Sequence, residues 1–172
     1  MREHVVKGWH RVVAGKERTV ISTRPDCRKS DEAKPVEPVR KRLVLVVEDD
    51  TEMRKMLAFV LTRHGFCVAQ ARDGSEALEY LGDVVLGGSR EKTPQLLLTD
   101  QRMPGFCGLE VIEAVRLAGL DIPAILITAF GDAETHERAD ALGATPVLDK
   151  PFAMRDLVAM AQRLVPADPQ DG

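Results

Sequence analysis

The sequence is poor in cysteine and lacks long apolar stretches, and each absence excludes a class of protein. Its three cysteines, Cys27, Cys67 and Cys107, are odd in number and scattered, so they fit neither a disulfide framework nor a zinc site. No apolar run approaches the roughly 18 residues of a membrane span, and residues 1–15 lack the apolar core of a signal peptide. We therefore expect a protein of the reducing cytoplasm with no membrane partner.

Charge is distributed unevenly along the 172 residues. Residues 1–42 contain twelve Lys or Arg and six Asp or Glu, a net charge of +6, whereas residues 43–172 contain twelve and twenty-one, a net charge of −9. The first segment has no sustained apolar period and is rich in proline near its end, which is typical of a linker. We predict a basic, weakly ordered extension (1–42), a globular domain (43–165) and a short tail (166–172).

From residue 43 onward, short apolar runs alternate with segments of helical period. The run 43–47 is continuous and mostly β-branched, as expected of a strand buried on both faces. The alternation predicts an α/β domain, in which a parallel sheet of five strands has helices on both faces. The ligand site of such a sheet lies beyond the carboxyl ends of its strands. The predicted strands are 43–47, 66–71, 96–99, 124–128 and 146–148.

Capping residues and apolar faces predict the helices. We expect the first helix to end at Gly65 and Ser75 to be the N-cap of the second. Residues 84–95 are interpreted as a loop insertion that joins this second helix to the third strand. The predicted inner face of the first helix comprises Met53, Met56, Leu57, Val60 and Leu61.

Polar residues stand at the ends of four predicted strands. Glu48 and Asp49 follow the first, Asp100 the third and Lys150 the fifth, while Thr128 closes the fourth. Each residue alone has a simple structural interpretation, such as a helix cap. Together they bring carboxylates, a hydroxyl and an ammonium to one edge, where a hard divalent cation relieves the repulsion between carboxylates. Mg²⁺ also coordinates phosphate oxygens, so the set indicates a site that handles phosphoryl groups.

Four segments follow one another along the chain: VLVVEDD (44–50), LLTDQRMPG (97–105), ITA (127–129) and DKPF (149–152). Together, and in this order, they resemble the receiver domain of two-component response regulators. The resemblance covers about residues 42–165 and implies a flavodoxin-like, doubly wound fold with strand order 2-1-3-4-5. It implies a signalling switch, not an enzyme, which takes a phosphoryl group from a histidine kinase or a histidine phosphotransfer protein. Such a switch assists its own phosphorylation and dephosphorylation.

The resemblance also implies a role for each site residue. Asp100 corresponds to the phosphoacceptor, Thr128 to the switch hydroxyl and Lys150 to the phosphate-binding lysine. The bond between Lys150 and Pro151 corresponds to one that is cis in the family. The implied Mg²⁺ ligands are Asp49, Asp100 and the backbone carbonyl of Arg102, with Glu48 usually acting through water.

Several positions modify these expectations. Val147 stands where the family usually has an aromatic residue that rotates on activation, so that switch is in doubt. Arg102 and Phe130 match positions that flank the path of the hydrolytic water. We expect both to slow hydrolysis, since Phe130 cannot orient water and Arg102 can bind phosphoryl oxygens; the alternative is that both point to solvent.

Residues 165–172 are too few for an output domain, so we expect a stand-alone receiver with a downstream protein target and a possible phosphorylation-dependent dimer.

Two other functions fit part of the sequence. An aspartyl-phosphate phosphatase also uses Asp and Mg²⁺, but it needs an Asp nucleophile on the first strand, where this chain has Glu48, and it leaves segment 100–104 unexplained. A regulator could bind nucleic acid through the basic segment 1–42. That segment has one aromatic residue, Trp9, and no compact motif, so we favour a solvated extension without a nucleic-acid partner.

Overall fold

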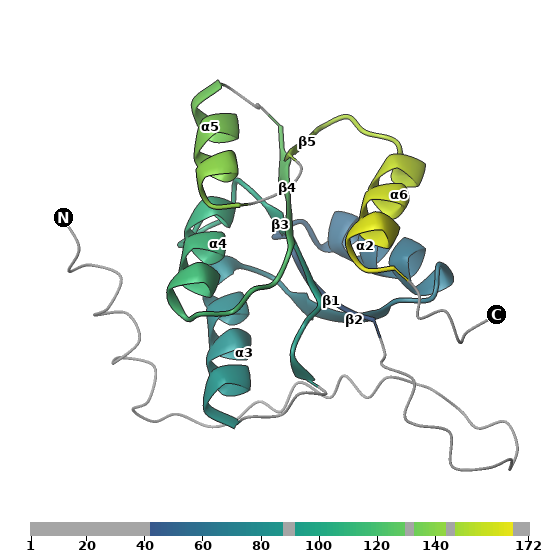
Figure 1. Ribbon diagram of the computed structural model, residues 1–172. Helices are drawn as coiled ribbons and strands as arrows, with labels where there is room; N and C mark the ends of the chain where they lie inside the picture. The colour runs from purple at the N-terminus through teal and green to yellow at the C-terminus, as the bar shows by residue number, and fades with distance from the viewer. Residues whose placement is uncertain (1–41, 88–91, 130–132, 144–146, 167–172) are drawn as a thin grey trace, which may run out of the picture.

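The computed structural model describes residues 42–87, 92–129, 133–143 and 147–166. Phe130, the extension 1–41 and the tail 167–172 lie outside these ranges, and so do the expectations that concern them. The described residues form strands and helices in strict alternation (Figure 1). In chain order these are β1 (Leu43–Val47), α2 (Thr51–Arg63), β2 (Cys67–Ala71), α3 (Gly74–Gly87), β3 (Leu96–Asp100), α4 (Gly108–Leu117), β4 (Ala124–Thr128), α5 (Ala133–Ala141), β5 (Val147–Asp149) and α6 (Met154–Leu164).

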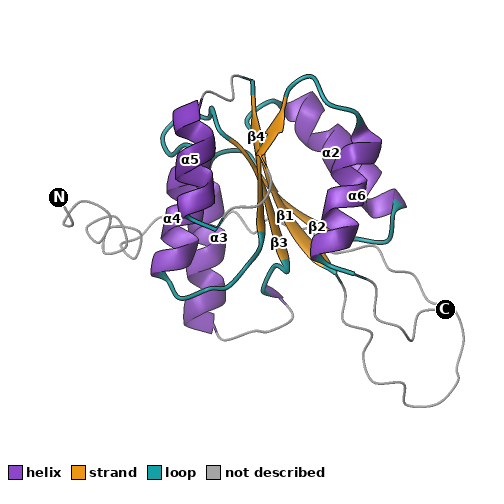
Figure 2. Ribbon diagram, turned by 45° about the horizontal axis from the view of Figure 1, so that its top comes forward, coloured by secondary structure: helices purple, strands orange, loops and turns teal. Residues whose placement is uncertain are grey.

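The strands form one parallel sheet in the order β2-β1-β3-β4-β5, which confirms the predicted fold class. Helices α3, α4 and α5 cover one face of the sheet, and α2 and α6 cover the other (Figure 2). The register pairs Val47 with Thr99, Asp100 with Ile127 and Thr128 with Asp149. The carboxyl ends of β1, β3, β4 and β5 therefore meet along one edge.

Alternate side chains of the central strands enter two separate apolar layers. Leu45 and Leu97 belong to the cluster beneath α3, α4 and α5, whereas Val46 and Leu98 belong to the cluster beneath α2 and α6. Every residue of β3 and β4 is buried. Because burying one such side chain stabilises the fold by about 2 kcal/mol, the strands that carry Asp100 and Thr128 are firmly held.

Three local expectations were wrong. Helix α3 extends to Gly87, so the start of the expected insertion is helical, and Val84 is buried on the inner face of this helix. Asp73, not Ser75, caps α3, because its Oδ1 accepts the Glu76 N–H at 2.8 Å. Met56 is 42% exposed; the face that α2 buries is narrower than its apolar pattern and consists of Leu57, Ala58 and Leu61.

Gly108, the first residue of α4, lies too close to β3 to carry a side chain. A Cβ there would stand 2.4 Å from the Asp100 carbonyl oxygen and 2.7 Å from Leu126 Cδ1. We expect Gly108→Ala to lower the free energy of unfolding in urea by about 2 kcal/mol, because the backbone must shift. Gly87→Ala is the matched control, since a Cβ at Gly87 meets nothing within 4 Å. Equal stability of the two variants would contradict the close approach.

Candidate functional site

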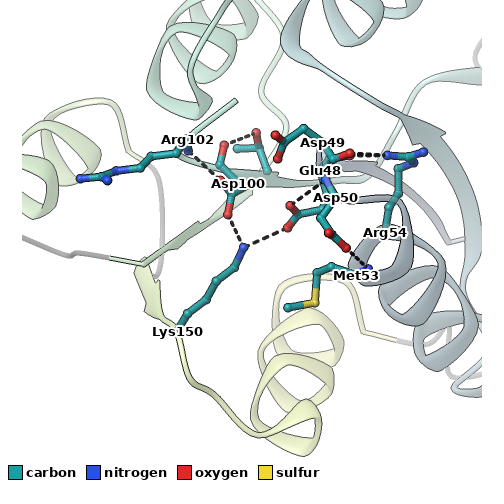
Figure 3. Close-up of polar contacts among 9 residues, drawn as sticks. Glu48, Asp49, Asp50, Met53, Arg54, Asp100, Arg102 and Lys150 are labelled. Atoms are coloured by element: carbon teal, nitrogen blue, oxygen red, sulfur yellow. Dashed lines mark hydrogen bonds and ion pairs between the residues drawn. The ribbon is translucent and has the colours of Figure 1, made fainter. Parts of the chain in front are cut away.

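The polar residues that follow the strands meet at the edge of the sheet (Figure 3). Lys150 Nζ lies 2.6 Å from Asp100 Oδ1 and 3.1 Å from Glu48 Oε2. The two carboxylates are almost fully buried, with 6% and 2% of their side chains exposed, whereas Lys150 is 26% exposed. The ammonium therefore enters from the solvent side and is shared by two acids at the ends of neighbouring strands: Glu48, which follows β1, and Asp100, which ends β3.

The pKa values of this cluster reflect burial and crowding. Burial, and after it the charge of Asp100, raises the pKa of Glu48 above its usual value, although Lys150 acts in the opposite direction. Burial disfavours the charged form of Lys150, but its hydrogen bond to Asp100 and the charges of Asp100 and Glu48 outweigh burial and raise the pKa of Lys150. Lys150 therefore stays an ammonium at neutral pH.

The second oxygen of Asp100 is fixed by the loop that follows β3. The Arg102 N–H donates to Asp100 Oδ2 at 2.7 Å, while the Arg102 side chain is exposed and extends away from the carboxylates (Figure 3). Both Asp100 oxygens thus accept a hydrogen bond, one from the ammonium and one from the backbone. This restricts rotation of the carboxylate and orients it at the edge of the sheet.

The turn between β1 and α2 is held by contacts that the sequence interpretation missed. Arg54 donates to the carbonyl oxygen of Glu48 at 2.6 Å and to that of Asp49 at 3.3 Å. Asp50 Oδ1 accepts the Met53 N–H at 2.7 Å and so caps α2. The only available signal for Arg54 was a long basic side chain one turn after the acids, a pattern that does not distinguish this contact from an exposed helix residue.

The carboxylate cluster fits a divalent cation. One carboxylate oxygen from each of Glu48, Asp49 and Asp100 lies within 4.8 Å of the others, and Asp49 is exposed to solvent. Three carboxylates against the single ammonium of Lys150 leave a formal charge of −2, which one Mg²⁺ would neutralise. Oxygen donors with one open side are also the ligand set that Mg²⁺ prefers, because it keeps part of its water shell.

The structure describes Thr128, Val147 and Pro151 among the remaining predicted residues. Thr128 is 1% exposed at the end of β4, and its carbonyl oxygen accepts the Lys150 N–H at 2.7 Å. Val147 begins β5 and packs, partly buried, against the apolar layer beneath α3, α4 and α5. The peptide bond between Lys150 and Pro151 is cis, as the resemblance implies. Phe130 lies outside the described residues.

Known protein sequences give a clear family match. The response regulator receiver domain matches residues 44–162. The chain is 36% identical over 120 residues to the phosphate regulon transcriptional regulatory protein PhoB of Klebsiella pneumoniae, which covers 69% of this chain and 49% of PhoB. It is 37% identical over 124 residues to the alkaline phosphatase synthesis transcriptional regulatory protein SphR of Synechococcus elongatus, covering 71% and 48%. The chain thus spans about half the length of the curated relatives it matches.

Solved structures agree in fold. The chemotaxis response regulator CheY4 of Vibrio cholerae is 30% identical with a TM-score of 0.61, covering 73% of this chain and 99% of CheY4. The response regulator TrrA of Thermotoga maritima, solved in complex with Mg(2+)-BeF, is 27% identical with a TM-score of 0.61, covering 72% and 99%. Among the described residues, no helix has the length and apolar character needed to cross a membrane.

Proposed function

Since this chain belongs to the response regulator receiver domain family, we propose that it is a switch activated by phosphorylation of Asp100. The observation that carries this proposal is the position of Asp100, buried at the end of a central strand, 2.6 Å from Lys150 Nζ and beside Glu48 and Asp49. Family membership favours this function over the Mg²⁺-dependent phosphatase. The proposed donor is a histidine kinase or a histidine phosphotransfer protein.

In the proposed reaction, an Asp100 oxygen attacks the phosphorus of a phosphohistidine. The P–N bond breaks, and its electron pair stays on the imidazole nitrogen. Lys150 neutralises part of the charge that otherwise keeps a carboxylate away from an anionic phosphoryl group, and the Thr128 hydroxyl binds a phosphoryl oxygen of the product. Mg²⁺, held by Asp49, Asp100 and the Arg102 carbonyl with Glu48 through water, would supply further positive charge. The complex of the relative TrrA with Mg(2+)-BeF supports this metal.

Phosphorylation changes the contacts that hold the edge of the sheet. In the unphosphorylated chain, the ammonium of Lys150 bridges Asp100 and Glu48. We propose that after phosphorylation it turns to the phosphoryl group. Thr128 then moves towards the same group. This movement shifts the population from the inactive to the active conformation of the surface formed by α5, β5 and α6. We propose that this surface contacts a downstream protein or a second copy of the chain. Action as a stand-alone receiver stays a prediction.

The first test is phosphate uptake from a small donor. The purified chain should gain one phosphoryl group from acetyl phosphate when Mg²⁺ is present, detected by intact mass, and little when the metal is chelated. The acyl phosphate should be labile in alkali. A chain that gains no phosphate from acetyl phosphate or from any histidine kinase, although it binds Mg²⁺, would contradict the proposed function.

The lifetime of the phosphorylated chain should depend on the residues that flank the attacking water. We expect Phe130→Glu combined with Arg102→Asn to speed dephosphorylation several-fold, since gaining an aligned water is worth about 1–2 kcal/mol of barrier. Arg102 extends away from Asp100 in the unphosphorylated chain (Figure 3), so its side chain must rotate before it can slow hydrolysis. Each single variant should therefore be measured too. The check is the decay of phosphorylated protein after the donor is removed. If the double variant decayed as slowly as the wild type, the proposal that these two side chains shield the phosphoryl group from water would be contradicted.

A further inference from the structure

Helix α4, which follows the phosphoacceptor loop, begins with a weak N-cap. Cys107 is the N-cap residue and forms a capping box with Glu110, in which its thiol faces the Glu110 N–H. Ser, Thr, Asp or Asn is preferred at this position because an oxygen accepts the unpaired N–H groups of the first turn. A thiol is a poor acceptor by comparison. The Glu110 carboxylate bonds back to the Cys107 N–H at 2.8 Å, but it accepts none of the N–H groups inside the helix.

Gln101 supplies a stronger, oxygen acceptor to this first turn from eight residues away. Its side-chain Oε1 accepts the Leu109 N–H at 3.1 Å, and its backbone carbonyl accepts the Gly108 N–H at 3.2 Å. Its own N–H donates to the Ile127 carbonyl at 2.7 Å, which continues the pairing of β3 with β4. Gln101 is therefore fixed to the sheet and at the same time caps the first turn of α4.

The loop 102–107, which joins β3 to α4, is held by contacts at both of its ends. Arg102, the first residue of this loop, donates its N–H to Asp100 Oδ2 at 2.7 Å, and its carbonyl is the proposed Mg²⁺ ligand. At the other end, Gly108 packs directly on the Asp100 carbonyl oxygen. The start of α4 is consequently linked to the residue before Arg102 by backbone contacts of Gly108 and, in addition, by the side chain of Gln101.

We propose that Gln101 is a positioning residue of the phosphorylation site. By bonding the Leu109 N–H, its amide oxygen holds loop 102–107 in the form that presents the Arg102 carbonyl to Mg²⁺. This inference rests on the proposed function, because it assigns a purpose to the same metal site. A merely structural cap would stabilise α4 without affecting the metal, and the two roles can be separated.

The variant Gln101→Met removes the acceptor oxygen and keeps an unbranched side chain of similar length. We expect the midpoint of Mg²⁺ binding, measured by calorimetry on the full chain, to rise about fivefold, in the direction seen when groups that orient metal ligands are lost. The melting temperature should fall by about 4 °C, the effect of losing one helix cap. The variant Cys107→Ser is neutral and nearly isosteric, and it provides a local cap.

The double variant Gln101→Met with Cys107→Ser decides between the two roles. A local cap restores the end of the helix but does not replace the bond between the residue-101 side chain and the Leu109 N–H. We therefore expect the melting temperature to return towards that of the wild type while Mg²⁺ binding stays weak. Recovery of wild-type Mg²⁺ binding in the double variant, or unchanged binding in Gln101→Met, would overturn the inference. Neither result would affect the proposed function, which fails only if the wild type itself takes up no phosphate.

Discussion

Replacement of Asp100 by Asn is expected to reduce phosphate uptake from acetyl phosphate to below about 1% of the wild-type level, because an amide oxygen is not a nucleophile comparable to a carboxylate. The nearby acids should not substitute for it. Glu48 is buried and bonded to Lys150, and Asp49 belongs to the proposed metal ligands. Labelling of the purified protein in the presence of Mg²⁺ measures the effect.

The fold should survive this substitution. Asn has the shape of Asp, its Oδ1 can still accept the Arg102 N–H, and Lys150 keeps its bond to Glu48. Asp50→Asn is the matched control, since Asp50 lies at the same edge and Asn preserves the cap of α2. This control should be labelled like the wild type. Labelling of Asp100→Asn at the wild-type level, with a normal melting temperature, would show that another residue is the phosphoacceptor.

The second large effect is expected for Asp49→Ala. Asp49 is the exposed member of the carboxylate cluster and, by the family match, a direct ligand of Mg²⁺. Its loss should weaken Mg²⁺ binding about a hundredfold and slow phosphorylation correspondingly at low Mg²⁺. Glu48→Ala should have a clearly smaller effect on the metal, because one oxygen of Glu48 already accepts a hydrogen bond from Lys150 and Glu48 is proposed to reach the ion only through water. Titration of Mg²⁺ on both variants provides the comparison.

The two substitutions should differ in a second property. Glu48 is a buried carboxylate with a raised pKa, and its removal breaks the bond to Lys150 Nζ at 3.1 Å. Glu48→Ala is therefore expected to alter the melting temperature more than Asp49→Ala, whose side chain is exposed. If Glu48→Ala lost more Mg²⁺ affinity than Asp49→Ala, or the two lost equal amounts, the roles of the acidic pair would have been assigned in the wrong order.

Much of the sheet could be predicted from the sequence because buried parallel strands are continuous apolar runs. The predicted strands 43–47 and 124–128 coincide with β1 and β4. The strand order came from the resemblance, since alternation alone specifies parallel strands without ordering them. The sequence also predicted that Glu48, Asp100 and Lys150 lie close together, because the carboxyl ends of parallel strands share one edge of the sheet.

Other features depend on contacts that no local pattern encodes. Helix α3 continues to Gly87, through the start of the segment expected as a loop, and Val84 within that part is buried. Met56 is exposed although its spacing places it on the apolar face of α2, whose buried residues are Leu57, Ala58 and Leu61. Arg54 bonds backbone carbonyl oxygens of the turn before its own helix, and Gln101 bonds a backbone N–H in the first turn of α4. Such partners become visible only when the backbone is placed.

The central claim, phosphorylation of Asp100, can be tested directly by reducing the phosphorylated chain with borohydride, which converts an aspartyl phosphate to homoserine and spares free carboxylates. Trypsin then separates the candidates, since peptide 93–102 contains Asp100 as its single acidic residue, whereas Glu48, Asp49 and Asp50 lie together in peptide 43–54. Tandem mass spectrometry should find homoserine at position 100, only after treatment with acetyl phosphate and Mg²⁺. Homoserine in peptide 43–54, with residue 100 unchanged, would contradict the account.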